Sequence, residues 1–211
     1  MLLNNLSKYS KNYDFKVQDG LLIVFSGPSG VGKGTIVKEL VKIYPDELVL
    51  SISATTRNPR VGELDGKEYF FKTKDEFENL IKNNMLLEYA SFNGQFYGTP
   101  KDYVQKQVKD GKNVFLEIEV QGALKIKQNW KGPSIFIFVL PPSLDVLEQR
   151  LRGRNTETEE AINNRLSIAR KELEYISEYD YIIVNDTISC SVDFVKSIIK
   201  TEYFKVNRVL D

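Results

Sequence analysis

The chain has 211 residues, of which 42% are apolar and 27% charged, and its 29 basic side chains balance 29 acidic ones. This length suits one domain, or a compact core with insertions, and is enough to bury a substantial core. The formal net charge of zero argues against a general nucleic-acid binder, so we expect no nucleic-acid partner. The longest apolar runs, Leu21–Phe25 and Ile135–Leu140, are too short to cross a bilayer, so we expect no membrane partner either.

The residue types that the sequence lacks exclude several kinds of catalytic and metal-binding site. There is no histidine, which excludes an imidazole base or metal ligand, and Cys190 is the single cysteine. One cysteine excludes an intramolecular disulfide, a zinc ribbon and an iron–sulfur cluster, and it suits the reducing cytoplasm. Carboxylates, lysines, arginines, hydroxyls and backbone amides remain. They suffice for phosphoryl transfer, because its catalysis is mostly positioning and charge neutralisation.

Strands and helices alternate along most of the chain. Residues 1–19 are polar and lack the apolar core of a secretory signal, so we expect a short N-terminal extension. The apolar run Leu21–Phe25 is typical of a strand covered on both faces, and a helical pattern ended by Pro45 follows its glycine-rich turn. Further strands are predicted at Val49–Ser53, Val114–Ile118, Ile135–Leu140 and Tyr181–Val184, and helices at Lys101–Lys109, Gln121–Asn129, Leu144–Ile176 and Ser191–Phe204. This order predicts an α/β fold with a parallel sheet flanked by helices.

The segment Thr55–Pro100 interrupts that alternation. It is rich in Gly, Tyr, Phe and Asn and contains two short strand-like pieces, Tyr69–Lys72 and Met85–Phe92. We therefore expect it to form an inserted subdomain rather than part of the main sheet.

The turn after the first strand carries the most specific motif in the chain. Its glycines allow several backbone N–H groups to point into one concavity at a helix N-terminus, which binds phosphate, and Lys33 adds a mobile positive charge. The spacing, the lysine and the strand–loop–helix context together match a P loop. The alternative, a glycine-rich connection with an exposed lysine, does not account for all of these features. The predicted ATP-binding residues of the loop are Gly27, Ser29, Gly30, Val31, Gly32, Lys33, Gly34 and Thr35.

Further motifs occur in the same order as in the guanylate kinase family, which the chain resembles from about Leu21 to near its C-terminus. They are SATTRNPR (53–60), GELDGKEY (62–69), Glu88, YGT (97–99), EIEVQG (117–122) and GRNTET (153–158). The resemblance implies an enzyme of purine nucleotide metabolism that phosphorylates GMP, and also dGMP, with ATP and Mg²⁺. It also implies a P-loop kinase core (20–52, 101–149 and 171–211), a mixed α+β GMP-binding subdomain (53–100) and a helical lid (150–170).

The residues of the inserted segment suit a nucleoside monophosphate, because arginine forks and hydroxyl groups bind a dianionic phosphate well. The resemblance assigns the GMP phosphate to Arg57, Arg60, Tyr69 and Tyr97. The alternative for the two arginines is a solvated loop with surface ion pairs, since most charged residues are simply exposed.

Guanine presents two neighbouring donors, N1–H and the N2 amine, which one carboxylate can accept side by side, whereas adenine presents an acceptor at N1. The resemblance gives this role to Glu88, with Ser53 and Thr99 on the other side of the base and Glu119 near the base or ribose. A site of buried polar partners rejects the wrong base by roughly 10⁴-fold or more. The alternative for Glu88 is an ordinary exposed carboxylate.

Two departures from family patterns concern Mg²⁺. A P loop usually has Ser or Thr directly after its lysine as a magnesium ligand, but this chain has Gly34 there and Thr35 next. Glu117, at the carboxyl end of a strand where α/β sheets bind ligands, replaces the Asp that the family commonly has. We therefore expect no direct protein ligand and assign Glu117 to the ion through water. The alternative is a strand-end glutamate in solvent.

A cluster of arginines precedes an acidic helix start, at which Thr156 or Thr158 can act as N-cap. The resemblance implies that lid arginines reach the ATP and GMP phosphates when the lid closes. Arg152 matches no family role and is expected to be a solvated side chain. The predicted catalytic residues are Lys33, Arg150, Arg154 and Arg165.

Asn185, after the last strand, resembles the family loop beside the adenine of ATP, although Asn-Asp is also common turn chemistry. Cys190 could have a lowered thiol pKa near a helix start, but we expect a small packing residue.

Two other functions compete with a guanylate kinase. An inactive binding module for phosphorylated proteins would have lost the P-loop and lid residues, which this chain keeps. A kinase for another monophosphate would lack the residues assigned to guanine. Monomer and homodimer remain equally open.

Overall fold

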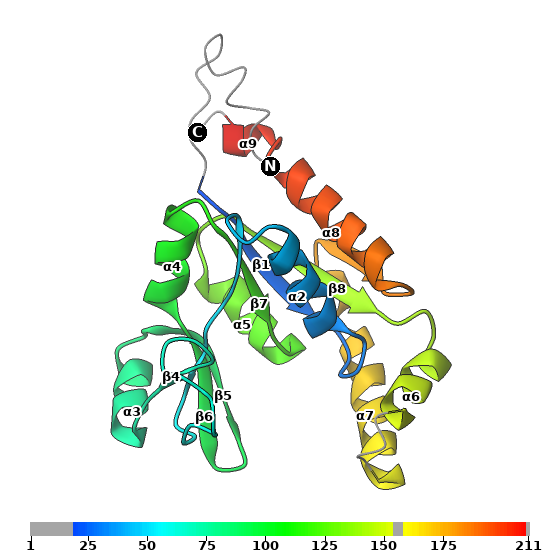
Figure 1. Ribbon diagram of the computed structural model, residues 1–211, viewed down its shortest axis with the longest axis horizontal. Helices are drawn as coiled ribbons and strands as arrows, with labels where there is room; N and C mark the ends of the chain where they lie inside the picture. Colours follow the sequence, from blue (N-terminus) through cyan, green and yellow to red (C-terminus); the bar gives the residue numbers. More distant parts are fainter. Residues whose placement is uncertain (1–18, 154–157, 210–211) are drawn as a thin grey trace.

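Residues 19–153 and 158–209 are described by the computed structural model, in which two β-sheets organise the chain (Figure 1). Within these residues the main sheet has five strands in the order β2-β7-β1-β8-β9, and all of its pairs are parallel. The strands are β1 (Leu22–Ser26), β2 (Leu48–Leu50), β7 (Asn113–Glu117), β8 (Ser134–Leu140) and β9 (Tyr181–Val184). The predicted parallel α/β sheet is confirmed.

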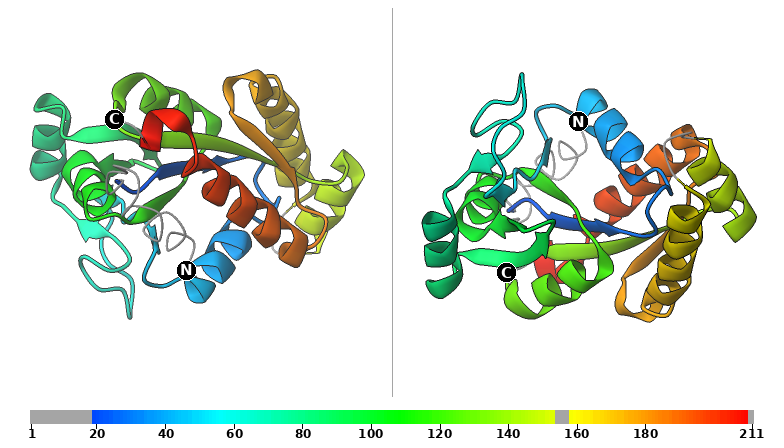
Figure 2. Two further views of the ribbon diagram at one scale, coloured as in Figure 1. Left: turned by 90° about the horizontal axis from the view of Figure 1, so that it is seen from above. Right: turned by 90° about the horizontal axis from the view of Figure 1, so that it is seen from below.

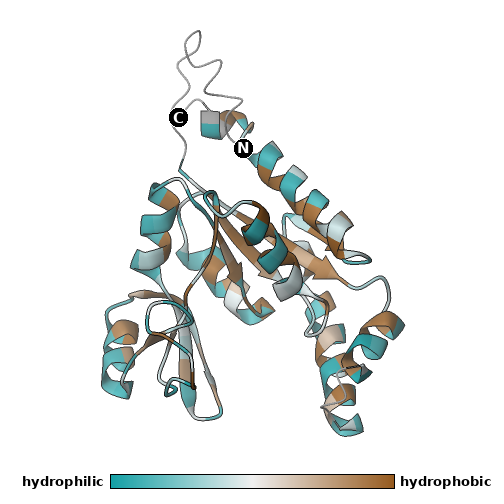
Figure 3. Cartoon of the chain, viewed as in Figure 1, coloured by the Kyte–Doolittle hydropathy of each residue, from teal (hydrophilic) through white to brown (hydrophobic). Residues whose placement is uncertain are grey.

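Helices cover both faces of this sheet because side chains of β1 alternate between two cores. Ile23 and Phe25 pack with α2 (Lys33–Ile43) and α8 (Ile188–Glu202). Leu22 and Val24 pack in a second cluster with α4 (Lys101–Lys109) and α5 (Val120–Asn129). Figure 2 shows α2 and α8 on one side of the sheet and α5 on the other, and Figure 3 shows the apolar strands between helices whose outer faces are polar.

The inserted segment forms a separate mixed sheet in the order β4-β3-β6-β5. Its strands are β3 (Ala54–Thr55), β4 (Phe70–Phe71), β5 (Leu86–Phe92) and β6 (Gln95–Pro100), and helix α3 (Lys74–Lys82) covers it. Phe77 of α3 is fully buried and stacks on Phe96 with ring centroids 5.4 Å apart. This sheet and the pair α6 (Leu144–Arg152) and α7 (Glu159–Leu173) project from the same end of the core, on opposite sides (Figure 1).

Several predicted boundaries are wrong. The segment Leu144–Ile176 is not one helix, because Gly153 caps the C-terminus of α6 and the side chain of Thr158 caps the N-terminus of α7. Thr156, the other predicted cap, lies outside the described residues. The second strand spans Leu48–Leu50 instead of Val49–Ser53.

The last helices also begin and end differently from the prediction. Helix α8 begins after Thr187, whose side chain accepts a hydrogen bond from the Cys190 N–H, so it starts before the predicted Ser191. It is followed by α9 (Val206–Val209), and a 3-10 turn (Ile176–Glu178) precedes β9. Among the described residues, no helix is both long and apolar enough to cross a membrane.

Candidate active site

The turn between β1 and α2 folds as the predicted anion-binding loop. Gly27, Gly30 and Gly32 have φ values of 140°, 89° and 99°, which L side chains rarely adopt. A Cβ on Gly27 would lie 2.2 Å from the Val139 carbonyl oxygen, so the loop approaches β8 too closely for a side chain there. Backbone amides at the N-terminus of α2 and this turn together favour a phosphate group.

A buried carboxamide supports the loop from behind. Asn185 is 2% exposed; its Nδ2 donates to the Val31 carbonyl (2.7 Å), and its Oδ1 accepts from the Ser191 hydroxyl (2.8 Å). The Arg150 guanidinium donates to the carbonyls of Val31 (3.4 Å), Asn185 (3.0 Å) and Asp186 (3.4 Å). The Asn185 side chain therefore supports the P loop and Ser191, which common Asn-Asp turn chemistry does not account for. The roles of Asn185 and Arg150 toward ATP stay predictions, but both side chains hold the P loop in this structure.

Lys33 begins α2 and folds back over the loop. Its ammonium donates to the carbonyls of Gly27 (2.5 Å) and Pro28 (3.1 Å). Burial lowers the pKa of Lys33, while the carboxylates of Glu117, Glu172 and Glu119 act in the opposite direction. The Lys33 ammonium therefore lies near three carboxylates and is hydrogen-bonded to two loop carbonyls. A bound phosphate group can take the place of these carbonyls as its hydrogen-bond partner.

A cavity of about 750 Å³ joins the P loop, the end of β7, helix α7 and the small sheet. It brings together predicted residues from distant parts of the sequence. Those that line it are Gly27, Ser29, Lys33, Ser53, Tyr69, Glu117, Glu119 and Arg165. Residues that the sequence did not single out also line it, among them Leu50, Ser51, Phe92, Asn164, Ile168 and Glu172.

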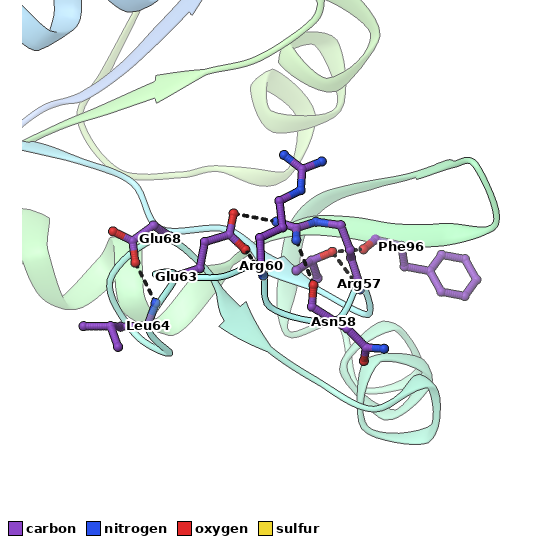
Figure 4. Close-up of polar contacts among 8 residues, drawn as sticks. Arg57, Asn58, Arg60, Glu63, Leu64, Glu68 and Phe96 are labelled. Carbon is purple, nitrogen blue, oxygen red and sulfur yellow. Dashed lines mark hydrogen bonds and ion pairs between the residues drawn. The ribbon is translucent and has the colours of Figure 1, made fainter.

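The residues assigned to the GMP phosphate lie on the small sheet and on the loop between its strands β3 and β4. The Arg57 guanidinium lies 5.3 Å from the centre of the Tyr69 ring, and the rings of Tyr69 and Tyr97 meet edge to face at 6.2 Å. Arg57 is ion-paired with Glu63 at 3.0 Å, as the alternative allowed, but less than a fifth of either side chain is exposed, so this pair is not a solvated one. Arg60 is exposed, and its guanidinium extends away from the other labelled side chains in Figure 4.

Glu88 lies on β5 and is half-buried, so the alternative of an ordinary exposed carboxylate is wrong. Its Oε1 accepts a hydrogen bond from the hydroxyl of buried Thr99 at 2.7 Å, and burial raises the pKa of Glu88. A Cβ on Gly122 would lie 3.4 Å from Glu88 Oε2, so this oxygen faces the first turn of α5. The structure thus pairs Thr99 with Glu88, and their contact with a base stays a prediction.

Glu117 lies directly over the unusual glycine of the P loop. A Cβ on Gly34 would be 3.1 Å from Glu117 Oε2. The missing side chain at residue 34 therefore leaves room for the carboxylate that is one methylene longer than the family's usual residue. Glu119 is the N-cap residue of α5, and both glutamates line the cavity.

Helix α7 brings Arg165 to the P loop, where its Nη1 donates to the Ser29 hydroxyl at 2.6 Å. Arg152 is exposed, as expected of a solvated side chain, and it forms surface ion pairs with Glu148 (2.8 Å) and with Glu159, which join α6 to the start of α7. Arg154, the remaining predicted catalytic residue, lies outside the described residues. Cys190 is exposed, so the prediction of a packing residue is wrong.

Glu172 is the main site residue that sequence reasoning missed. Burial raises its pKa to about 7, although Lys33 acts to lower it. Arg165, Ile168 and Glu172 are spaced i, i+3, i+7 on α7 and all line the cavity, so this helical spacing from Arg165 was the signal that could have found it.

The two sheets and the phosphate-binding loop first define a class, the P-loop α/β phosphotransferases with an inserted sheet. The guanylate kinase family model matches residues 20–202. The chain is 52% identical over 192 residues to a guanylate kinase of Oceanobacillus iheyensis, covering 91% of this chain and 92% of that protein. It is also 52% identical over 192 residues to one of Streptococcus thermophilus, covering 90% and 91% respectively.

A crystal structure of guanylate kinase from Anaplasma phagocytophilum has the same fold, with a TM-score of 0.69, 33% identity, and coverage of 92% of this chain and 91% of that one. The chain belongs to the guanylate kinase family.

The position of Glu172 predicts a pH-dependent cost to stability. Its pKa is about 7 in the folded protein and near 4.5 in the unfolded chain, so the folded state binds the proton more tightly. The free energy of unfolding therefore falls as pH rises through this interval. Glu172→Gln removes the charge, and its gain in melting temperature over the wild type should be larger at pH 8 than at pH 5.

The control is Glu174→Gln, at the exposed end of the same helix, which should show the same small difference at both pH values. A melting-temperature difference for Glu172→Gln that does not change with pH would contradict the assignment.

Proposed function

We propose that the 750 Å³ cavity is where this guanylate kinase phosphorylates GMP with ATP, and that the residues predicted from the sequence bind the two substrates and stabilise the transferred phosphoryl group. One observation carries the proposal: the P-loop lysine Lys33 and the small-sheet residues Ser53 and Tyr69 line the same cavity. The two substrates can therefore meet there, with their phosphates between the P loop and the small sheet.

On the ATP side, the P-loop amides hold the β- and γ-phosphates and Lys33 neutralises charge on the γ-phosphoryl oxygens. Arg165, already bonded to Ser29, supplies a second cation from α7, and Arg150 and Arg154 complete the set. An oxygen of the GMP phosphate attacks the γ-phosphorus in line; a new P–O bond forms to GMP and the bond to the ADP oxygen breaks. No general base is needed, because the attacking oxygen is already anionic.

On the GMP side, Arg57, Arg60, Tyr69 and Tyr97 hold the phosphate. Glu88 accepts the two guanine donors, and the Thr99 hydroxyl fixes this carboxylate in place. Ser53 bonds the other side of the base, Thr99 stays beside Glu88, and Glu119 lies near the base or ribose. Asn185 acts on the ATP side through the loop that it supports.

The cavity suits a cation brought by the substrate. Its described lining has four carboxylates, Glu68, Glu117, Glu119 and Glu172, against two cationic side chains, Lys33 and Arg165. Mg²⁺ keeps several waters and binds phosphates together with few carboxylates, so ATP can bring it into this cavity. Glu117 would hold it through water, and the bound ion would neutralise charge on the ATP oxygens.

The chain divides into three parts in this proposal. We assign residues 20–52, 101–149 and 171–211 to the P-loop core, 53–100 to the GMP-binding subdomain and 150–170 to the lid. Closure of the lid over the cavity excludes water, which would otherwise accept the phosphoryl group. The protein is expected to act in the cytoplasm, as a monomer or homodimer, and to use dGMP as well.

A comparison of acceptors tests the proposal. ADP release is measured with ATP, Mg²⁺ and either GMP, dGMP, AMP, CMP or UMP. GMP and dGMP should be used well, and the others should have kcat/KM values lower by roughly 10⁴-fold.

Lys33→Met, which removes the P-loop cation, should lower kcat by roughly 10²-fold or more. Equal use of AMP and GMP would contradict the assigned base-reading residues, and full activity of Lys33→Met would contradict the assigned ATP side.

Glu88→Gln tests the base-reading carboxylate separately. The amide presents one acceptor and one donor, so one guanine donor loses its partner, and kcat/KM for GMP should fall roughly 10²-fold. The KM for ATP should stay within about twofold, because the substitution lies outside the ATP side of the cavity. A discrimination between GMP and AMP equal to that of the wild type would count against Glu88.

A further inference from the structure

The loop that precedes β4 carries a carboxylate, Glu63, to which the reaction described above gives no role. Its Oε1 accepts from the Arg57 Nη2 at 3.0 Å, and its Oε2 accepts from the backbone N–H of Arg60 at 2.8 Å (Figure 4). One carboxylate thus contacts both arginine positions assigned to the GMP phosphate. It binds the first through its side chain and the second through its main chain.

The arginine that Glu63 contacts is held in one orientation. The side chains of Arg57 and Glu63 are only 17% and 18% exposed. Arg57 Nη1 also donates to the Asn58 carbonyl at 2.8 Å, and the guanidinium lies over the rings of Tyr69 (5.3 Å) and Phe71 (5.9 Å). A guanidinium has five N–H donors in a rigid fork, so donors remain for a phosphate after these two bonds.

The second arginine differs. The Arg60 side chain is exposed, and its guanidinium makes no hydrogen bond or ion pair to any residue within 19–153 or 158–209. In Figure 4 it extends away from the Arg57–Glu63 pair. Glu63 therefore anchors the backbone of Arg60 but leaves its side chain able to move.

We propose that Glu63 is a positioning residue for GMP binding: it holds the Arg57 guanidinium ready for the phosphate and anchors the loop from which Arg60 reaches the same phosphate. This inference rests on the proposed function, which assigns Arg57 to the GMP phosphate. A long side chain fixed before binding loses less conformational entropy when the ligand arrives. The hydrogen bonds from Arg57 and from the Arg60 backbone lower the pKa of Glu63, so its carboxylate stays ionised at neutral pH.

The opposite role is also physically possible, and it predicts an effect of opposite sign. A carboxylate on Arg57 can imitate a phosphate and compete with it, and its removal would then strengthen GMP binding. The geometry favours positioning, because the second oxygen of Glu63 is committed to the backbone and the guanidinium keeps unused donors. The direction of the change in GMP affinity decides between the two roles.

Glu63→Ala is the primary variant. Its KM and dissociation constant for GMP should rise roughly tenfold or more, which corresponds to loss of a charge-assisted hydrogen bond. The kcat at saturating GMP and the KM for ATP should stay within about twofold. Glu63→Gln should resemble it, because the amide nitrogen must face one of two donors, while Glu63→Asp should retain more of the affinity. Unchanged or stronger GMP binding by Glu63→Ala would overturn the inference.

The matched control is Glu78→Ala, on α3 of the same insertion, where Glu78 forms an exposed pair with Lys74 at 3.8 Å. It should bind GMP like the wild type. Circular dichroism and melting temperatures of all variants show whether the fold is intact, and the affinity of Glu63→Gln and Glu63→Asp keeps the test valid if Glu63→Ala unfolds.

A double-mutant cycle separates this inference from the proposed function. In an Arg57→Ala background, Glu63→Ala should raise the GMP dissociation constant by a clearly smaller factor than in the wild type, because only its contact with the Arg60 backbone is left to act through. If Arg57→Ala alone leaves GMP binding unchanged, the proposed phosphate site is wrong. If Arg57→Ala weakens binding and the effect of Glu63→Ala is additive to it, only the positioning role is wrong.

Discussion

Electrostatic repulsion between two phosphate groups is the constraint on which the structure depends. Both substrates are anionic, and four of the cavity's six charged lining residues are carboxylates. Positive charge must therefore be placed where the phosphates meet. In the proposed mechanism this charge comes from groups that the fold already gathers: loop amides at the N-terminus of α2, Lys33 over that loop, and Arg165 bonded to it from α7. Preorganised charges of this kind need no reorientation during the reaction, which is what makes them effective.

Much of the fold could be predicted because its signals are local. The main strands are continuous apolar runs, and the P loop is a contiguous motif. The contacts that position the site are not local: Asn185 holds Val31 across 154 positions of the chain. In the sequence, Asn-Asp after a strand indicates only a turn. The carboxamide of Asn185 reaches the P loop because β9 pairs with β8, and this pairing is not visible in the local sequence. The Asn93-Gly94 turn between β5 and β6, in contrast, was a local hairpin signal and was overlooked.

The sequence also predicted which side chains lie near one another better than it predicted their individual contacts. Eight of the predicted site residues line one cavity, but sequence alone could not show what each side chain contacts without substrate. Arg57 is held by Glu63, Thr99 by Glu88, and Lys33 by two carbonyls of its own loop. Partial burial of ionisable groups such as Lys33 and Glu172 opposes folding, and the two apolar clusters around the main sheet supply the compensating stability.

The central claim is that two anionic groups are held from opposite walls of one cavity. It is tested most directly by a crystal structure with a bisubstrate analogue, adenosine and guanosine joined through five phosphates. The account predicts that the phosphate chain runs from the P loop and Lys33 to Arg57 and Tyr69, with the guanine N1 and N2 on Glu88. A guanine base remote from Glu88, with no phosphate on Arg57, would contradict it.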